Sequence, residues 1–270
     1  MGTAITEKNI TNEHKKAFSL IVKEVIAVSD IVLEILDARF IDQTRIPELE
    51  NEVRAAGKKL IFILNKVDLV DPRKLEEEGK LKDVKPYVFL SAKSKKGKAS
   101  LIRKLKIEVA KAKIPFPRAQ VGIIGYPNTG KSTIINYLIH RRAAPTSSEA
   151  NYTRGMQKIK LTKGILLIDT PGIVPPSEDN LLGKSIIKKA EIGAERFSQT
   201  KDPELVVSTL MKTHSKEIEK FYGMEHSDNY EDFAENLGRK MNLLLRGNRV
   251  DLDKTYRRVI KDWQAGKIKV

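Results

Sequence analysis

The stretch VGIIGYPNTGKSTIINYLIH, residues 121–140, places the octet GYPNTGKS at 125–132 between an apolar run and a helical pattern. The octet matches G-x-x-x-x-G-K-[ST], the pattern of a loop that holds phosphate groups. Its glycines let backbone N–H groups turn inward around the phosphates, at a helix N-terminus that favours negative charge. The sequence therefore predicts a strand ending at Gly125, a phosphate-binding loop and a helix beginning at Lys131.

The pattern assigns roles within this loop. Lys131 is predicted to reach the β- and γ-phosphates, and Ser132 to bind Mg²⁺. An ordinary glycine turn is the alternative, but the flanking strand and helix patterns argue against it. The remaining residues predicted to surround the phosphates are Pro127, Asn128, Thr129, Gly130 and Thr133.

A second motif, Asp169-Thr170-Pro171-Gly172, follows the apolar run GILLI at 164–168. The Asp169 carboxylate would hold Mg²⁺ through water, and the Gly172 N–H could meet the γ-phosphate. Alone, DTPG could be a plain turn. Downstream of a phosphate loop, the catalytic interpretation is favoured.

A third motif, Asn65-Lys66-Val67-Asp68, ends the apolar run LIFIL at 60–64. A carboxylate at Asp68 can accept from the N1–H and the exocyclic amine of guanine, while the Asn65 amide contacts the other edge and the Lys66 stem lies on the ring. Adenine has no N1–H, and a buried unpaired carboxylate costs about 1–3 kcal/mol or more. The motif therefore predicts a guanine site.

The triplet Ser91-Ala92-Lys93 follows another apolar run, YVFL at 87–90. It supplies the usual partner loop of a guanine site, and the Ala92 N–H is expected to meet the guanine oxygen. The cofactors predicted from these motifs together are GTP or GDP and Mg²⁺.

Strand and helix patterns alternate along the first two thirds of the chain, which indicates an α/β fold with a mostly parallel sheet, helices on both faces and ligands at the carboxyl ends of the strands. Past Pro176 only helical periodicity remains. We therefore expect a GTP-binding domain over 1–177 and an all-helical, basic domain over 178–270. The strands are predicted at 31–39, 60–64, 87–90, 121–125 and, as a pair joined near Lys163-Gly164, 158–169; the helices are predicted at 14–28, 47–56, 71–81 and 98–112 and after Lys131.

The motif order is unusual, because a standard GTP-binding domain places its phosphate loop first. Reading 119–172 before 13–93 restores the usual succession. The chain is therefore predicted to be circularly permuted, with the linker that holds Pro115 and Pro117 joining the old ends and the cut just after DTPG. Such rearrangement is tolerated because the termini of a compact domain often lie close together on its surface.

With Asp37-Ala38-Arg39 as a further motif, the whole chain resembles the circularly permuted ribosome-assembly GTPases of the YlqF/YawG (RbgA-like) family. The resemblance implies a GTP hydrolase, slow alone, that binds the large ribosomal subunit or its precursor and couples hydrolysis to an assembly step. It also implies that Asn128 coordinates a K⁺ ion, and that Ile173 stands where other GTPases carry a water-orienting glutamine. The implied switch residue, which would also bind Mg²⁺, is Thr153, with Thr146 as a weaker rival.

The 270 residues contain 50 Lys+Arg and 35 Asp+Glu, a net charge of +15 that favours a polyanionic partner such as RNA. The C-terminal domain resembles the one that contacts ribosomal RNA in the family, and its aromatic residues are Tyr256 and Trp263, of which Trp263 is expected in the core. The predicted basic surface comprises Lys240, Arg246, Arg249, Lys254, Arg257, Arg258, Lys261, Lys267 and Lys269.

The chain has no cysteine, which excludes disulfides and thiol chemistry. With no apolar run long enough to span a bilayer, we expect a cytoplasmic monomer without a membrane partner. The alternative function is a non-enzymatic RNA-binding module whose guanine-nucleotide site is structural or sensing.

Overall fold

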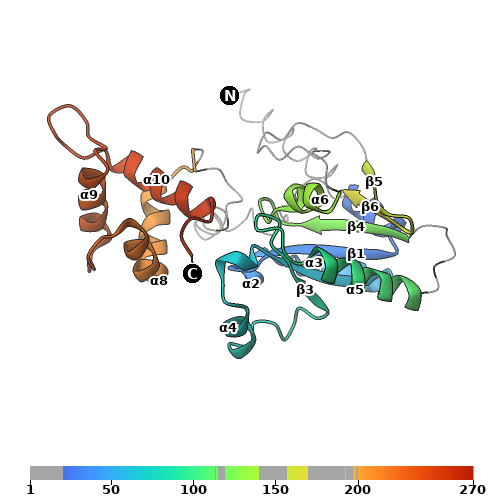
Figure 1. The fold of residues 1–270 in the computed structure, drawn as a ribbon. Coiled ribbons are helices and arrows are strands. Elements are labelled where there is room, and N and C mark those ends of the chain that lie inside the picture. Colours follow the sequence, from blue (N-terminus) through green and yellow to red (C-terminus); the bar gives the residue numbers. More distant parts are fainter. Residues whose placement is uncertain are drawn as a thin grey trace, which may run out of the picture. The chain divides into compact units, whose positions relative to one another are not determined.

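The computed structural model describes residues 21–112, 114, 119–139, 157–169, 192, 197, 198 and 200–269. The chain divides into two compact units, residues 1–176 and 177–270. The first contains the sheet and the second contains helices (Figure 1).

The first unit is built on one six-stranded sheet with the order β3-β2-β1-β4-β6-β5. All neighbouring pairs are parallel except β5 and β6, which form an antiparallel hairpin. This confirms the mostly parallel sheet and the strand pair joined at Lys163-Gly164. The strands are β1 (Ile31–Asp37), β2 (Lys59–Asn65), β3 (Tyr87–Phe89), β4 (Ala119–Gly125), β5 (Gln157–Thr162) and β6 (Ile165–Asp169).

The described helices of this unit follow the predicted positions with two differences, and residues 14–20 of the predicted first helix lie outside the described residues. Helix α4 ends at Glu77 rather than near residue 81, because Gly79 adopts a positive φ of 70° that interrupts the helix. Two short helices, α2 and η1, were not predicted, since three or four residues give no periodicity to detect. Besides the helix over 21–28, the helices are α2 (Ile41–Thr44), α3 (Pro47–Ala55), the 3₁₀-helix η1 (Val67–Leu69), α4 (Pro72–Glu77), α5 (Lys98–Lys111) and α6 (Lys131–Ile139).

Strand β1 lies in the middle of the sheet, and all seven of its residues are buried. Its side chains alternate between two apolar clusters, as strand geometry requires. One cluster joins Leu33 and Ile35 to residues of α5 and α6, and the other joins Val32 and Leu36 to residues of α3 and the helix over 21–28. Helices therefore cover both faces, which explains why the strand sequences are almost wholly apolar.

Over its described residues, the second unit contains the helices α8 (Pro203–Tyr222), α9 (Tyr230–Lys240) and α10 (Leu252–Gln264), which pack together. Its core contains Trp263 and Phe233, whose side chains are among the largest that are fully buried. This confirms the interpretation of Trp263 as a core residue. The buried Asp262 carboxylate ties α10 to its surroundings, because it accepts hydrogen bonds from Tyr222, Arg258 and Lys267 at 3.0, 2.7 and 2.7 Å.

No helix among the described residues is both long and apolar enough to cross a lipid bilayer.

One buried carboxyl group interrupts the apolar face of β1. Glu34 has no exposed surface, and its Oε1 accepts the Ile46 N–H at 2.8 Å, while Oε2 has no hydrogen-bond partner among the described residues. Burial, reinforced by the neighbouring Glu50 carboxylate, raises the pKa of Glu34 from 4.5 to about 8. Glu34 is therefore protonated in the folded protein at neutral pH.

This raised pKa predicts a pH-dependent loss of stability. Between pH 4.5 and about 8 the unfolded chain releases the Glu34 proton while the folded chain retains it, so the free energy of unfolding falls as the pH rises. Glu34→Gln keeps the size and the Ile46 contact but cannot ionise. We expect the variant to be more stable than the parent at pH 8, by an amount on the order of a few kcal/mol, and similar to it at pH 4.5.

Urea unfolding at several pH values between 4.5 and 8 measures this difference. Parallel pH curves for the two proteins would contradict the assignment of Glu34 as the titrating group.

Candidate nucleotide-binding site

The parallel strands bring the predicted motifs to one edge of the sheet. In the register of the sheet, Asp37 pairs with Asn65, Ile35 with Gly125, and Ile123 with Asp169. Four strands separated in sequence, β1, β2, β4 and β6, thus end side by side along one edge, and each carries a motif at its carboxyl end. This is the edge at which parallel α/β sheets bind their ligands.

The phosphate loop connects β4 to α6 with two glycines in conformations that other residues rarely adopt. Gly125 has a φ of 150° and Gly130 a φ of 98°. A Cβ on Gly125 would lie 2.7 Å from the Ile35 carbonyl oxygen, and a Cβ on Gly130 would overlap the Asn65 Nδ2. The loop therefore approaches the neighbouring backbone and side chains as closely as glycine allows, as a phosphate cradle requires.

Lys131 begins α6 and is buried, with its Nζ 3.3 Å from the Gly125 carbonyl oxygen. Burial lowers the pKa of Lys131 to about 8, and the Asp169 carboxylate opposes that shift. A buried ammonium at a helix N-terminus suits a phosphate group. The negative charge of the phosphate would stabilise the ammonium, which has little contact with water. Ser132 and Asp169, both half-buried, add a hydroxyl and a carboxylate, the oxygen ligands that Mg²⁺ prefers. These residues fit a nucleotide phosphate with its Mg²⁺.

The side chain of Asn65 connects three loops. Its Nδ2 donates to the Thr129 carbonyl oxygen at 2.7 Å, and its Oδ1 accepts the Ala92 N–H at 3.3 Å. The sequence predicts that the Asn65 amide and the Ala92 N–H meet the edges of the base, and this stays a prediction. In the structure these two groups bond to each other and Asn65 also bonds to Thr129, so Asn65 links the phosphate loop to the Ser91-Ala92-Lys93 loop.

Asp68 and Ser91 form the other link between the two loops predicted to surround the base. The Ser91 Oγ donates to Asp68 Oδ1 at 2.5 Å and accepts the Ser94 N–H at 3.0 Å. The half-buried Asp68 carboxylate therefore has a fixed orientation, whereas Lys93 in the same loop is exposed. A fixed carboxylate suits selection of a base through paired N–H donors.

Lys66 adopts a left-handed backbone conformation with a φ of 63°. Its Nζ donates to Asp37 Oδ2 at 2.6 Å and to the Asn128 carbonyl oxygen at 2.9 Å. The sequence had identified Asp37 only as part of a family motif. The available signal for a role in the site was a carboxylate at the carboxyl end of a mostly apolar strand, the same position that the NKVD motif takes on its own strand.

The remaining predicted residues of the phosphate loop differ in their exposure. Pro127 is half-buried, Asn128 and Thr133 are exposed, and Thr129 is buried, with its Oγ1 donating to the Tyr126 carbonyl oxygen at 2.9 Å. Gly172, Thr153, Thr146 and Ile173 lie outside the described residues.

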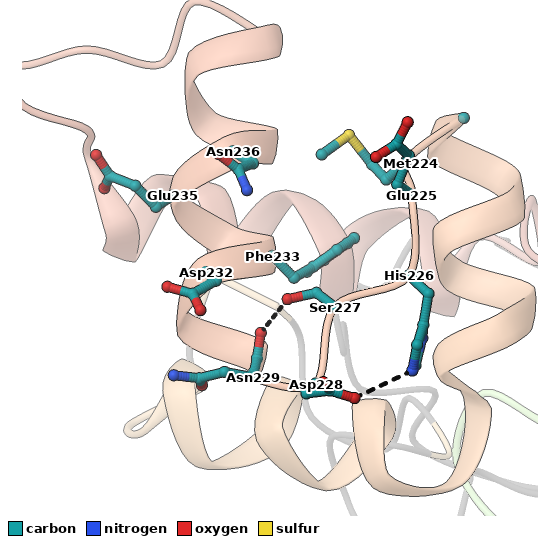
Figure 2. Close-up of a pocket in the computed structure, with 11 residues that line it drawn as sticks. Met224, Glu225, His226, Ser227, Asp228, Asn229, Asp232, Phe233, Glu235 and Asn236 are labelled. Atoms are coloured by element: carbon teal, nitrogen blue, oxygen red, sulfur yellow. Dashed lines mark hydrogen bonds and ion pairs between the residues drawn. The ribbon is translucent and has the colours of Figure 1, made fainter.

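A hollow of about 690 Å³ lies in the helical unit, between the end of α8 and α9 (Figure 2). Its lining includes four carboxylate residues, Glu225, Asp228, Asp232 and Glu235, and none of the motif residues. His226 lies 3.4 Å from the Asp228 carboxylate. Carboxylates repel phosphate groups, so this hollow does not suit a nucleotide.

Comparisons with known proteins agree with the site. A family model described as 50S ribosome-binding GTPase matches residues 120–237. The crystal structure of GNP-bound YlqF from T. maritima has a TM-score of 0.63 and 26% identity, and the match covers 92% of this chain and 93% of that one.

Relatives from archaea and eukaryotes match most of this chain. A GTP-binding protein of Methanocaldococcus jannaschii is 35% identical over 92% of this chain and 65% of its own length. A nuclear GTP-binding protein of Saccharomyces cerevisiae is 33% identical over 99% of this chain and 58% of its own length. The chain thus spans less than two thirds of the length of these relatives.

The sheet, the glycine-rich loop and the linked NKVD and SAK loops define a P-loop protein of the GTP-binding class. In the order of its motifs and over 92% of its length, the chain is similar to YlqF, a circularly permuted GTPase, and part of it matches the 50S ribosome-binding GTPase model.

The close approach of Gly130 to Asn65 generates a prediction. Gly130→Ala places a methyl group against the Asn65 amide and strains a backbone φ of 98°, so the phosphate loop must shift. We expect the affinity for GDP to fall at least about tenfold, as measured with a fluorescent GDP derivative.

Gly164→Ala is the matched control, because Gly164 lies in the β5–β6 turn with nothing within 4 Å of the added Cβ. It should bind GDP like the parent. Parental affinity in Gly130→Ala would show that the loop does not depend on this approach.

Proposed function

We propose that this chain binds GTP and GDP and hydrolyses GTP, and that it couples hydrolysis to a step in the assembly of the large ribosomal subunit. The observation that carries the proposal is the Asn65 side chain, which bonds to the phosphate loop and to the loop predicted to contact the base. Such a link positions the two ends of one nucleotide relative to each other. A nonspecific phosphate site would have no need of it.

The described residues support a division of roles in hydrolysis. Lys131 would neutralise charge on the β- and γ-phosphates, and Ser132 and Asp169 would hold Mg²⁺, which stabilises the charge that develops during phosphoryl transfer. The Gly172 N–H and the switch threonine, Thr153 by resemblance, would complete the γ-phosphate site. An apolar Ile173 cannot orient water, so we expect slow hydrolysis by the isolated chain.

A bound K⁺ ion would raise this slow rate of hydrolysis. Asn128 is exposed on the phosphate loop, and its carbonyl oxygen is held by Lys66. By resemblance to the family, Asn128 would coordinate K⁺ and so place positive charge near the phosphates, where other GTPases use an arginine.

The ribosomal partner is supported by charge and by similarity. The matching family model is described as ribosome-binding, and Lys and Arg are absent from residues 221–238 but frequent from Arg239 onward. Arg246 and Arg249 are exposed in the turn between α9 and α10, beside Leu244 and Leu245, which are 37% and 50% exposed. An exposed basic turn suits RNA phosphates.

Several residues of the predicted basic surface form ion pairs or hydrogen bonds within the protein. Arg258 and Lys267 bind Asp262, and Lys240 donates to the carbonyl oxygens that end α8. Arg257 bonds to Asp253 and to two carbonyl oxygens. The aromatic residues Tyr256 and Trp263 are buried, so they cannot stack on RNA bases. The proposed RNA contacts are therefore Arg246, Arg249, Lys254, Lys261 and Lys269.

The alternative function is an RNA-binding module whose nucleotide site senses GTP without turnover. It predicts tight GTP binding and no hydrolysis in the presence of large subunits.

The identity of the base is tested at Asp68. In Asp68→Asn the amide can donate to the extra carbonyl of xanthine but cannot accept two guanine N–H groups. We expect the ratio of GDP affinity to XDP affinity to fall at least about tenfold, measured by competition against a fluorescent nucleotide.

Asp71→Asn is the control, because Asp71 caps α4 three residues away and accepts from the backbone N–H and the side chain of Arg73. Unchanged selectivity in Asp68→Asn would remove Asp68 from the base site.

Hydrolysis is tested by measuring phosphate release with and without purified large ribosomal subunits, in KCl and in NaCl. We expect stimulation by the subunits, and rates in KCl at least about tenfold higher than in NaCl. Equal stimulated rates in the two salts would exclude the K⁺ role. Absence of turnover in every condition would favour the sensing module.

A double charge reversal, Arg246→Glu with Arg249→Glu, separates subunit binding from chemistry. It should reduce stimulation by the subunits and leave the intrinsic rate in KCl unchanged. Undiminished stimulation would place the RNA contacts elsewhere.

A further inference from the structure

Lys66 of the NKVD motif is held by a residue of another strand. Lys66 follows β2, and the carboxylate that holds it belongs to Asp37, the last residue of the neighbouring strand β1. We propose that Asp37 is a positioning residue of the guanine-nucleotide site, which fixes Lys66 against the carbonyl oxygen of Asn128. This inference rests on the proposed function, and it gives Asp37 a role in nucleotide affinity rather than in the chemical step.

The geometry forms a chain of contacts from β1 to the phosphate loop. Asp37 Oδ2 accepts from Lys66 Nζ at 2.6 Å, and the same Nζ donates to the Asn128 carbonyl oxygen at 2.9 Å. The pairing of Asp37 with Asn65 in the sheet places the carboxylate one residue from Lys66. The distance from β1 to the phosphate loop is thus bridged by a single side chain.

Arg39 fixes the carboxylate from the other side. Its Nε donates to Asp37 Oδ1 at 3.0 Å and its Nη2 to Oδ2 at 2.8 Å, a bidentate arrangement. The Arg39 N–H also donates to Oδ1 at 3.1 Å. Held at both oxygens, the carboxylate has one orientation, and Lys66 must take its position from it.

Burial makes this pair strong and its disruption costly. The Asp37 and Arg39 side chains are each 1% exposed and that of Lys66 is 22% exposed. Burial alone would raise the pKa of Asp37, but Lys66 and Arg39 outweigh burial and hold that pKa below its ordinary value. Without the carboxylate, two cations would face each other in a site with little water, and Lys66 would leave the Asn128 carbonyl oxygen.

A bound nucleotide would gain from this arrangement at two points. The hydrocarbon chain of Lys66, whose terminal Nζ is held by Asp37 and by the Asn128 carbonyl oxygen, would form a fixed surface for the base. The contact at the Asn128 carbonyl oxygen would hold the phosphate loop, whose Asn128 has a strained φ of 59°. A preorganised site binds more tightly because less ordering remains for the ligand to induce.

The test is a double-mutant cycle on affinity for a fluorescent GDP derivative, with Asp37→Asn, Lys66→Met and the combined variant. We expect Asp37→Asn to weaken binding about 10- to 100-fold in the parent, since a charge-assisted hydrogen bond is lost. In the Lys66→Met background the same change should weaken binding by no more than about twofold. The rate of GTP hydrolysis at saturating GTP should change far less than the affinity.

Glu50→Gln is the matched control. Glu50 is equally buried and is paired with two arginines, Arg45 and Arg54, and it has no ion pair or hydrogen bond with the nucleotide motifs that the structure describes. It should lower the melting temperature and leave GDP affinity unchanged, which separates loss of stability from loss of positioning. If Asp37→Asn does not fold, Asp37→Glu keeps the charge, displaces it by one methylene and should weaken binding by a smaller factor.

Three results would be decisive. Equal losses from Asp37→Asn with and without Lys66 would show that Asp37 does not act through Lys66 and would overturn the proposal. Parental affinity in Asp37→Asn, or in Asp37→Glu where only that variant folds, would overturn it as well. Failure of the parent protein itself to bind GDP would instead refute the proposed function.

Discussion

The parallel pairing of β1 with β2 on one side and β4 on the other is the constraint on which the nucleotide site depends. It sets Asp37 beside Asn65 and Ile35 beside Gly125, so the ends of three strands meet regardless of the order in which the chain visits them. The chemistry of the site needs only this spatial order. That is the physical reason why a circularly permuted chain can keep the motifs of a GTP-binding protein in working positions.

Hydrogen bonds between the loops then fix the positions of the motif side chains at this edge of the sheet. Asn65 bonds to the phosphate loop and to the Ala92 N–H, Ser91 holds Asp68, and Lys66 spans from Asp37 to Asn128. Apart from Asn128, which is exposed, these residues are wholly or partly buried, and a buried polar group that loses its partner is costly. The loops therefore constrain one another, and the site is organised in the protein before any ligand contributes to it.

In the helical unit, some basic side chains bond within the protein and others remain on the surface. Asp262 and the carbonyl oxygens at the end of α8 engage several of its basic side chains, and its aromatic residues fill the core. The basic groups that remain on the surface include those of the turn between α9 and α10, whereas carboxylates gather around the hollow beside α9. A polyanion would accordingly be attracted to one part of this unit and repelled from another.

The sequence by itself determined the strands, the mostly parallel sheet, the positions of the motifs and the burial of Trp263, because apolar periodicity and glycine spacing are local properties. It also indicated the family. Only the tertiary structure decided which atoms the motif residues bind. That Asn65 bonds to Thr129, that Asp37 holds Lys66 and that Glu34 remains protonated depend on residues far apart in the chain. Strand register, helix packing and burial bring those groups together, and no local pattern encodes the resulting distances.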